Sequence, residues 1–102
     1  MKILLKKRVS AEEGIIEAFK NNRSKIAKLL IKKIPLKKIN KVFKKSCIYG
    51  NLDISSFIVL NNLTQSEETI KNGIKLAAQN GYFDIVRFLL EYENIYNSVF
   101  VS

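Results

Sequence analysis

The sequence predicts an all-α protein, and three observations lead to this class. The 102 residues contain four Gly and one Pro, so few positions interrupt regular structure. The long stretches between these residues are rich in Lys, Leu and Ile, which favours helices over strands. A motif with Gly, Asp, Ile and Phe in register recurs after 31 residues, as expected when a structural unit is repeated. With 47% hydrophobic residues the chain can build one continuous core, which predicts a single domain over residues 1–102.

The repeated motif predicts three helix pairs. Each copy contains a helix, a tight turn at Asn22, Gly50 or Gly81, and a second helix that runs back beside the first. Gly ends a helix because it adopts positive φ without a Cβ clash, and Asn is its usual substitute. Asp53 and Asp84 follow the turn, where a carboxylate favours the positive end of the next helix. The three windows, offset by 28 and 31 residues, are 18–31, 46–59 and 77–90.

Start signals and breaks divide the chain into its elements. Ser10 and Thr64 each stand three residues before a Glu, which is the spacing of a capping box at a helix start. Pro35 marks a break between the first two pairs. The repeats span about residues 11–33, 38–61 and 66–92, and residues 93–102 form a C-terminal cap or tail, with a self-association surface as the alternative. The predicted helices are 11–21, 24–33, 38–48, 52–61, 66–79 and 83–92.

The second helix of each pair has apolar residues at helical spacing. A single pair cannot bury such a face, so the pairs are expected to stack against their neighbours. The residues concerned are Ile26, Leu29 and Leu30; Ile54, Phe57 and Ile58; and Ile85, Phe88 and Leu89.

The segment from Gly73 to Leu90 resembles the ankyrin-repeat family through its Leu-Ala-Ala first helix, Gly turn and Ile-Val-x-x-Leu-Leu second helix. The resemblance implies a short solenoid of about three stacked helix-turn-helix repeats. Asn72-Gly73-Ile74-Lys75 replaces the family's Thr-Pro-Leu-His turn, and the offsets fall short of about 33 residues. We therefore expect β-hairpin fingers that are reduced or absent, and we read Asn72-Gly73 as a turn or capping signal.

The family binds partners through a concave surface made from the first helices and the turns, which implies a set of contact residues here. Ile16 and Ile48 share these positions, but packing against neighbouring helices is an equally good interpretation for them. The implied partner-binding residues are Lys20, Asn21 and Arg23 in the first repeat, Lys44, Tyr49 and Asn51 in the second, and Lys75, Gln79, Asn80 and Tyr82 in the third.

The charge distribution suggests the kind of partner. Residues 1–45 hold fifteen basic and three acidic side chains, a net of +12, whereas residues 46–102 hold three and six, a net of −3. We predict a protein–protein interaction module whose partner protein has an acidic surface. A basic nucleic-acid-binding helical protein is the alternative, in which the lysines of residues 32–45 contact phosphates instead of forming a solvated helix face. Base-specific readout is disfavoured because the chain has only three Arg residues.

Catalysis is not expected from this set of residues. The chain has no His and a single Cys, Cys47, so it offers no Cys/His pair, no Ser/His/Asp triad and no zinc cluster. We predict that the protein is not an enzyme and needs no cofactor or metal. One unpaired Cys fits a reducing compartment, and no apolar run is long enough for a signal peptide or a membrane span. We expect a cytoplasmic monomer, with the cytosol of a host cell as the location if the origin is viral or bacterial.

Overall fold

The computed structural model describes residues 11–21, 23–61, 63 and 66–100. These residues form six α-helices and no strand, so the predicted all-α class is confirmed for this part of the chain. The helices are α2 (Ala11–Lys20), α3 (Ser24–Ile31), α4 (Leu36–Tyr49), α5 (Leu52–Leu60), α6 (Glu67–Gln79) and α7 (Phe83–Phe100).

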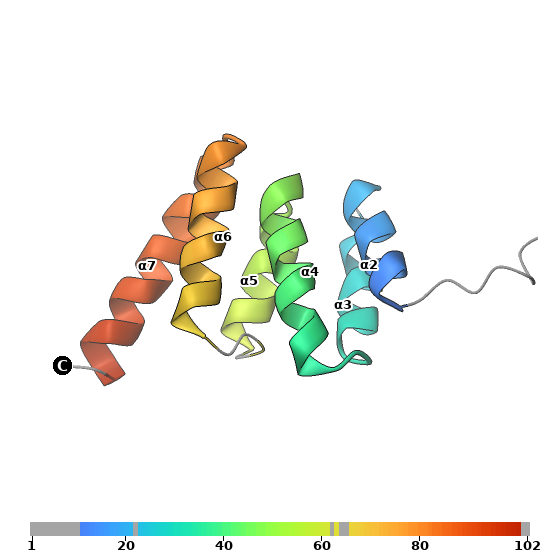
Figure 1. Ribbon diagram of the computed structural model, residues 1–102, viewed down its shortest axis with the longest axis horizontal. Coiled ribbons are helices and arrows are strands. Elements are labelled where there is room, and N and C mark those ends of the chain that lie inside the picture. The colour runs from blue at the N-terminus through green and yellow to red at the C-terminus, as the bar shows by residue number, and fades with distance from the viewer. Residues whose placement is uncertain (1–10, 22, 62, 64–65, 101–102) are drawn as a thin grey trace, which may run out of the picture.

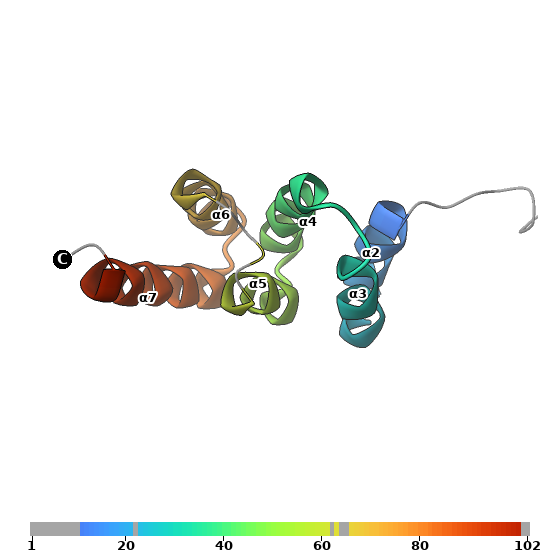
Figure 2. The same cartoon turned by 90° about the horizontal axis from the view of Figure 1, so that it is seen from below.

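The helices lie in two layers (Figures 1 and 2). One layer contains α2, α4 and α6, and the other contains α3, α5 and α7. Each helix contacts its pair partner across a short turn, and it contacts the neighbouring helix or helices of its own layer. The principal extents are 57, 27 and 19 Å, so the three pairs form a row.

An equivalent backbone hydrogen bond closes each of the three turns. In each turn the amide of the residue that follows it donates to the carbonyl five residues earlier. Gly50 and Gly81 have φ of +77° and +79°, which confirms the left-handed turn positions predicted there. Asn22 lies outside the described residues. The donors are Arg23, Asn51 and Tyr82, and their acceptors are Ala18, Ser46 and Ala77, at 2.9, 2.9 and 2.8 Å.

Two helix starts differ from the sequence-based prediction. Ser66 caps α6, because its hydroxyl accepts a hydrogen bond from the Thr69 amide at 3.1 Å. The capping box predicted at Thr64 is therefore wrong, since Glu67 is the first helical residue and not the third. α4 begins at Leu36, two residues earlier than predicted, because the Pro35 carbonyl already accepts a hydrogen bond from the Lys38 amide at 2.9 Å. The box predicted at Ser10 lies outside the described residues.

The last helix is longer than predicted. α7 continues to Phe100, whereas the predicted helix ended at residue 92. No Gly or Pro stops a helix between residues 91 and 100, so the helix continues past the predicted end. Residues 93–100 of the predicted cap or tail thus continue α7, and residues 101–102 lie outside the described residues.

The core is continuous across the row and contains Phe43, which is fully buried. Gly73 is buried inside α6, so the reading of Asn72-Gly73 as a turn is wrong. A Cβ atom at Gly73 would come within 2.5 Å of the Phe43 ring and 3.0 Å of the Cys47 sulfur. The absence of a side chain at this position lets α6 pack closely against α4.

Candidate functional site

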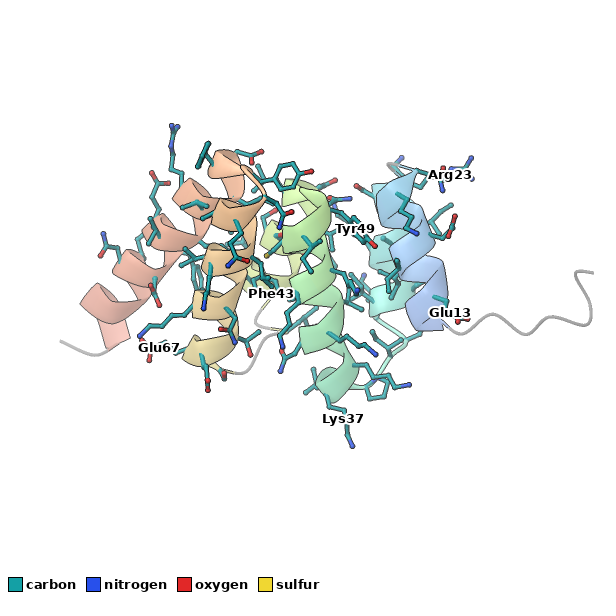
Figure 3. The ribbon with its side chains drawn as sticks, turned by 45° about the horizontal axis from the view of Figure 1, so that its top comes forward. Glu13, Arg23, Lys37, Phe43, Tyr49 and Glu67 are labelled. Carbon is teal, nitrogen blue, oxygen red and sulfur yellow. The ribbon has the colours of Figure 1, made fainter. Side chains whose placement is uncertain are left out.

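The structure describes all ten residues predicted to contact a partner, and eight of them are exposed. Figure 3 shows Arg23 and Tyr49 at the end of the molecule where the turns lie, while Lys37 lies at the opposite end. The exposed residues are Lys20, Asn21, Arg23, Lys44, Tyr49, Lys75, Gln79 and Asn80, and the half-buried ones are Asn51 and Tyr82.

Lys20 and Tyr49 bring the first two pairs together at this end. The ammonium nitrogen of Lys20 lies 5.9 Å from the centroid of the Tyr49 ring. This distance is typical of a cation–π contact, which at an exposed site contributes about 0.5–1 kcal/mol. Tyr49 keeps 38% of its surface exposed, so part of this side chain is accessible to solvent near the turns.

Three asparagines of the predicted set make hydrogen bonds within their own pair. The Asn51 side chain caps α5 by accepting from the Ile54 amide at 3.0 Å. Asn21 and Asn80 donate from Nδ2 to the carbonyl four residues earlier, at 2.9 and 2.8 Å. The Asn51 bond satisfies an amide that the helix start leaves unpaired, whereas the Asn21 and Asn80 side chains are second donors to carbonyls that already accept a backbone amide. The three asparagines therefore have structural roles that the sequence-based prediction did not assign.

Tyr82 packs over the turn of the preceding pair. A Cβ atom on Gly50 would overlap the Tyr82 ring, so the ring occupies the space that a side chain at position 50 would need. Tyr82 is half-buried and also packs against the core. Substitution of Tyr82 is therefore a poor probe of partner binding, because it also removes packing between two turns.

Ile16 and Ile48 are both half-buried. Their partial burial shows that packing takes up part of each side chain, and neither residue is a fully exposed contact.

The lysines of residues 32–45 lie on the solvent side of α4 and in the connection before it. Lys37, Lys38, Lys41 and Lys44 are exposed, and the opposite face of α4 is buried. Lys71 and Lys75 of the neighbouring α6 are also exposed. We call the exposed lysines of α4 and α6 the basic face; it consists of Lys37, Lys38, Lys41, Lys44, Lys71 and Lys75.

An ion pair between α3 and α5 was not foreseen from the sequence. The Lys28 ammonium lies 2.9 Å from the Asp53 carboxylate and 5.5 Å from the centroid of the Phe57 ring. The hydrogen bond from Lys28 lowers the pKa of Asp53, so the pair stabilises the fold above the ordinary pKa of an Asp and weakens as the pH falls through the folded value. Both groups are partly exposed, so the contribution is small. No local pattern links residues 28 and 53, because only stacking brings their helices together.

Cys47 is fully buried, as expected for a core position. Burial raises the pKa of its thiol from 9.0 to about 11, although hydrogen bonds with Ser55 and Ser46 act in the opposite direction. The Ser46 and Ser55 hydroxyls lie 2.7 Å apart and join α4 to α5. At neutral pH the thiol is protonated and shielded from solvent, which makes it a poor nucleophile.

We expect Cys47 to resist modification by a water-soluble disulfide reagent in the folded protein. The raised pKa alone lowers the thiolate fraction at pH 8 by about a hundredfold, and burial slows the reaction further. The rate measured in buffer, compared with that in denaturant, tests this, and similar rates in both would contradict it.

Because the folded pKa lies above the unfolded one, this thiol stabilises the fold below pH 9.0 and loses that contribution as the pH rises towards about 11.

Other chemistry finds little support in the described part of the chain. No group of three or more His, Cys, Asp or Glu side chains there could hold a metal ion. None of the described helices has the length and apolar character needed to cross a membrane. Comparison of the chain with known protein families, curated proteins and solved structures gave no match.

Proposed function

We propose that this chain is a protein-interaction module in which three ankyrin-like helix pairs stack as a short solenoid. Two observations support the stacking. The same hydrogen bond closes each of the three turns at equivalent positions. The main contacts between described helix pairs join each pair to its neighbour in the row, as in the stacking of repeats in a solenoid.

The observation that carries the function is the basic face. Its six lysines lie on two adjacent first helices, α4 and α6, and all are exposed. Lys20 and Arg23 of the first pair and Tyr49 of the second are exposed as well, and they lie near the turns of these two pairs. A positive surface of this kind steers and orients an acidic partner, and we propose a partner protein with an acidic surface.

This function needs no catalytic residue and no cofactor, in keeping with the prediction that the chain is not an enzyme. A single, buried cysteine supports a reducing cytoplasmic location as part of the proposal.

Charge reversal on the basic face tests the proposal. We expect Lys44→Glu with Lys75→Glu to weaken binding of a labelled poly-glutamate peptide about tenfold or more, measured by fluorescence anisotropy. The matched control is Lys32→Glu with Lys33→Glu, which changes the charge equally at exposed positions between α3 and α4. The control should bind almost as the parent protein does. Absence of peptide binding by the parent protein, or equal losses in both variants, would contradict the proposed surface.

The same lysines favour a second candidate, an electrostatic nucleic-acid binder. This function predicts that a labelled DNA duplex binds more tightly than the peptide and that its affinity falls steeply as salt is raised. Phosphate contacts depend on the number of positive charges and not on one arrangement of the lysines. Both double variants should therefore lose DNA affinity to a similar degree. Titration of peptide and duplex at two salt concentrations therefore separates the two functions.

A further inference from the structure

The two ends of the row differ from its middle in the burial of equivalent positions. By the alignment of the three turns, a residue of α3 corresponds to the residue 28 places later in α5 and 59 places later in α7. Ile54 of α5 and Ile85 of α7 are fully buried, whereas the equivalent Ile26 of α3 is 45% exposed. In this layer α3 has a neighbour on one side, α5, and no described helix precedes it on the other side. This position therefore faces the N-terminal end of the row.

A second set of equivalent positions shows the opposite pattern. Ile31 of α3 and Val59 of α5 are fully buried, whereas the equivalent Leu90 of α7 is 49% exposed. In the described part of the chain no helix follows α7 in this layer (Figure 2). The exposure of Leu90 therefore indicates that this position faces the C-terminal end of the row. The middle helix α5 thus buries one face towards each neighbour, and each end helix leaves one of these faces open.

The layer of α2, α4 and α6 follows the same rule. Cys47 of α4 is fully buried, and the equivalent Ala78 of α6 is exposed. Phe43 and Cys47 lie where a side chain at Gly73 of α6 would otherwise be. The equivalent of Gly73 in α2 is Gly14, which is only half-buried. The first layer therefore leaves the apolar Ala78 exposed at one end of the row, while at the other end the half-buried Gly14 lies beside Leu30, whose Cδ1 would be 3.1 Å from a Cβ atom built on Gly14.

We propose that copies of this chain stack head to tail through these two open ends. The C-terminal end face (Ile74, Ala78 and Leu90) of one copy packs on the N-terminal end face (Gly14, Ile26 and Leu30) of the next. In the middle pair the six equivalent positions are all fully buried. The contact between copies repeats the arrangement of one helix pair against the next. The proposal rests on the equivalence of the pairs and does not depend on the partner-binding function.

A second copy is the proposed occupant because the two end faces match each other. The middle pair packs on its neighbours through the equivalent positions, so the N-terminal end face of one copy fits the C-terminal end face of another. Charge adds to this match. The first pair, residues 11–33, holds six basic and three acidic side chains, a net of +3, while residues 67–100 hold three and five, a net of −2. Opposite net charges favour the approach of unlike ends over like ends.

One position opposes the stacking and makes the register testable. Within the chain Lys28 of α3 pairs with Asp53 of α5. The equivalent of Lys28 in α7 is Arg87, and the equivalent of Asp53 in α3 is Lys25. Head-to-tail contact therefore brings two cations together where the interior of the row has an ion pair. We expect self-association of the parent protein to be weak and its contact to be heterologous, so that chains of copies lengthen as concentration rises.

The test is sedimentation velocity of the full chain and three variants over a concentration series. Lys25→Asp restores the ion pair with Arg87 of the neighbouring copy and should strengthen association about tenfold. Leu90→Asp places a charge in the contact and should abolish association. Leu60→Asp is the matched control, because Leu60 is 63% exposed and its equivalents in the first and third pairs are the charged Lys32 and Glu91. This variant should associate as the parent protein does.

Circular dichroism of each variant checks that the helices are retained. A parent protein and a Lys25→Asp variant that both stay monomeric at every concentration would overturn the proposal, and the open faces would then belong to another occupant. Association that Leu90→Asp leaves unchanged, or that Lys25→Asp does not strengthen, would overturn the head-to-tail register. The variants used to test partner binding lie outside both end faces, so failure of one proposal is distinguishable from failure of the other.

Discussion

Replacement of Phe43 by alanine is expected to lower the free energy of unfolding by about 3–5 kcal/mol, because it leaves a cavity in the core. Phe43 is fully buried, and its ring lies where α4 meets α6. Such a loss is a large fraction of the stability of a domain of this size. Urea unfolding followed by circular dichroism measures the change. A loss below about 1 kcal/mol would mean that the ring is not enclosed as the structure shows.

Gly73→Ala tests the same contact, because its effect on the free energy of unfolding should change sign when Phe43 is also replaced by alanine. In the parent protein Gly73→Ala forces a Cβ atom into the Phe43 ring, and this overpacking costs about 1–3 kcal/mol. The gain in helix propensity from Gly to Ala offsets only about 1 kcal/mol of it. In the Phe43→Ala background the clash with the ring is gone, and the cavity gives the Cys47 sulfur, 3.0 Å from the built Cβ atom, room to shift, so Gly73→Ala should stabilise the protein by up to about 1 kcal/mol. An effect of the same sign in both backgrounds would rule out this contact.

Replacement of Gly50 by alanine is expected to cost about 2–5 kcal/mol, and two separate effects contribute. The positive φ of +77° is unfavourable for any residue with a Cβ atom, by about 1–2 kcal/mol. The new Cβ atom also meets the Tyr82 ring, which adds about 1–3 kcal/mol of overpacking or displaces the ring from its packed position. Denaturant unfolding again measures the loss.

Gly81 provides the matched control for this prediction. Its φ of +79° is almost the same, but nothing lies within 4 Å of a Cβ atom built there. Gly81→Ala should therefore cost only the backbone strain, about 1–2 kcal/mol. The excess at Gly50 should vanish when Tyr82 is also replaced by alanine. Equal costs at both glycines with Tyr82 present would show that the ring does not rest on the turn.

The positions of the turns and most helix boundaries could be predicted because they depend on neighbouring residues. Gly50 and Gly81 adopt the left-handed conformation expected of them. The errors arose where a local signal had two interpretations. Asn72-Gly73 has the composition of a turn, but Gly73 is needed inside a helix for close packing against Phe43. Two hydroxyl residues precede α6, and only the structure shows that Ser66 is the cap.

The candidate site was predictable as a set of exposed positions but not in its individual roles. The repeat alignment placed Lys44 and Lys75 on equivalent positions of the first helices and Lys20 at the position of Gln79, and these four residues are exposed. It gave no sign that Asn51 caps a helix or that Tyr82 covers a glycine of the preceding turn. Those roles depend on which atoms lie nearby in space, and residues that are far apart in the sequence supply some of them.

The sequence by itself determined the helical class, the Gly turns and the periodic apolar faces, because backbone preferences and helical spacing act over a few residues. The tertiary structure decided which apolar faces are covered. Ile26 and Ile54 occupy equivalent positions in the motif, yet Ile26 is exposed and Ile54 is fully buried. The difference arises because burial depends on the helix that stands on the other side. A residue at the end of a row lacks that neighbour even when its local sequence matches the middle.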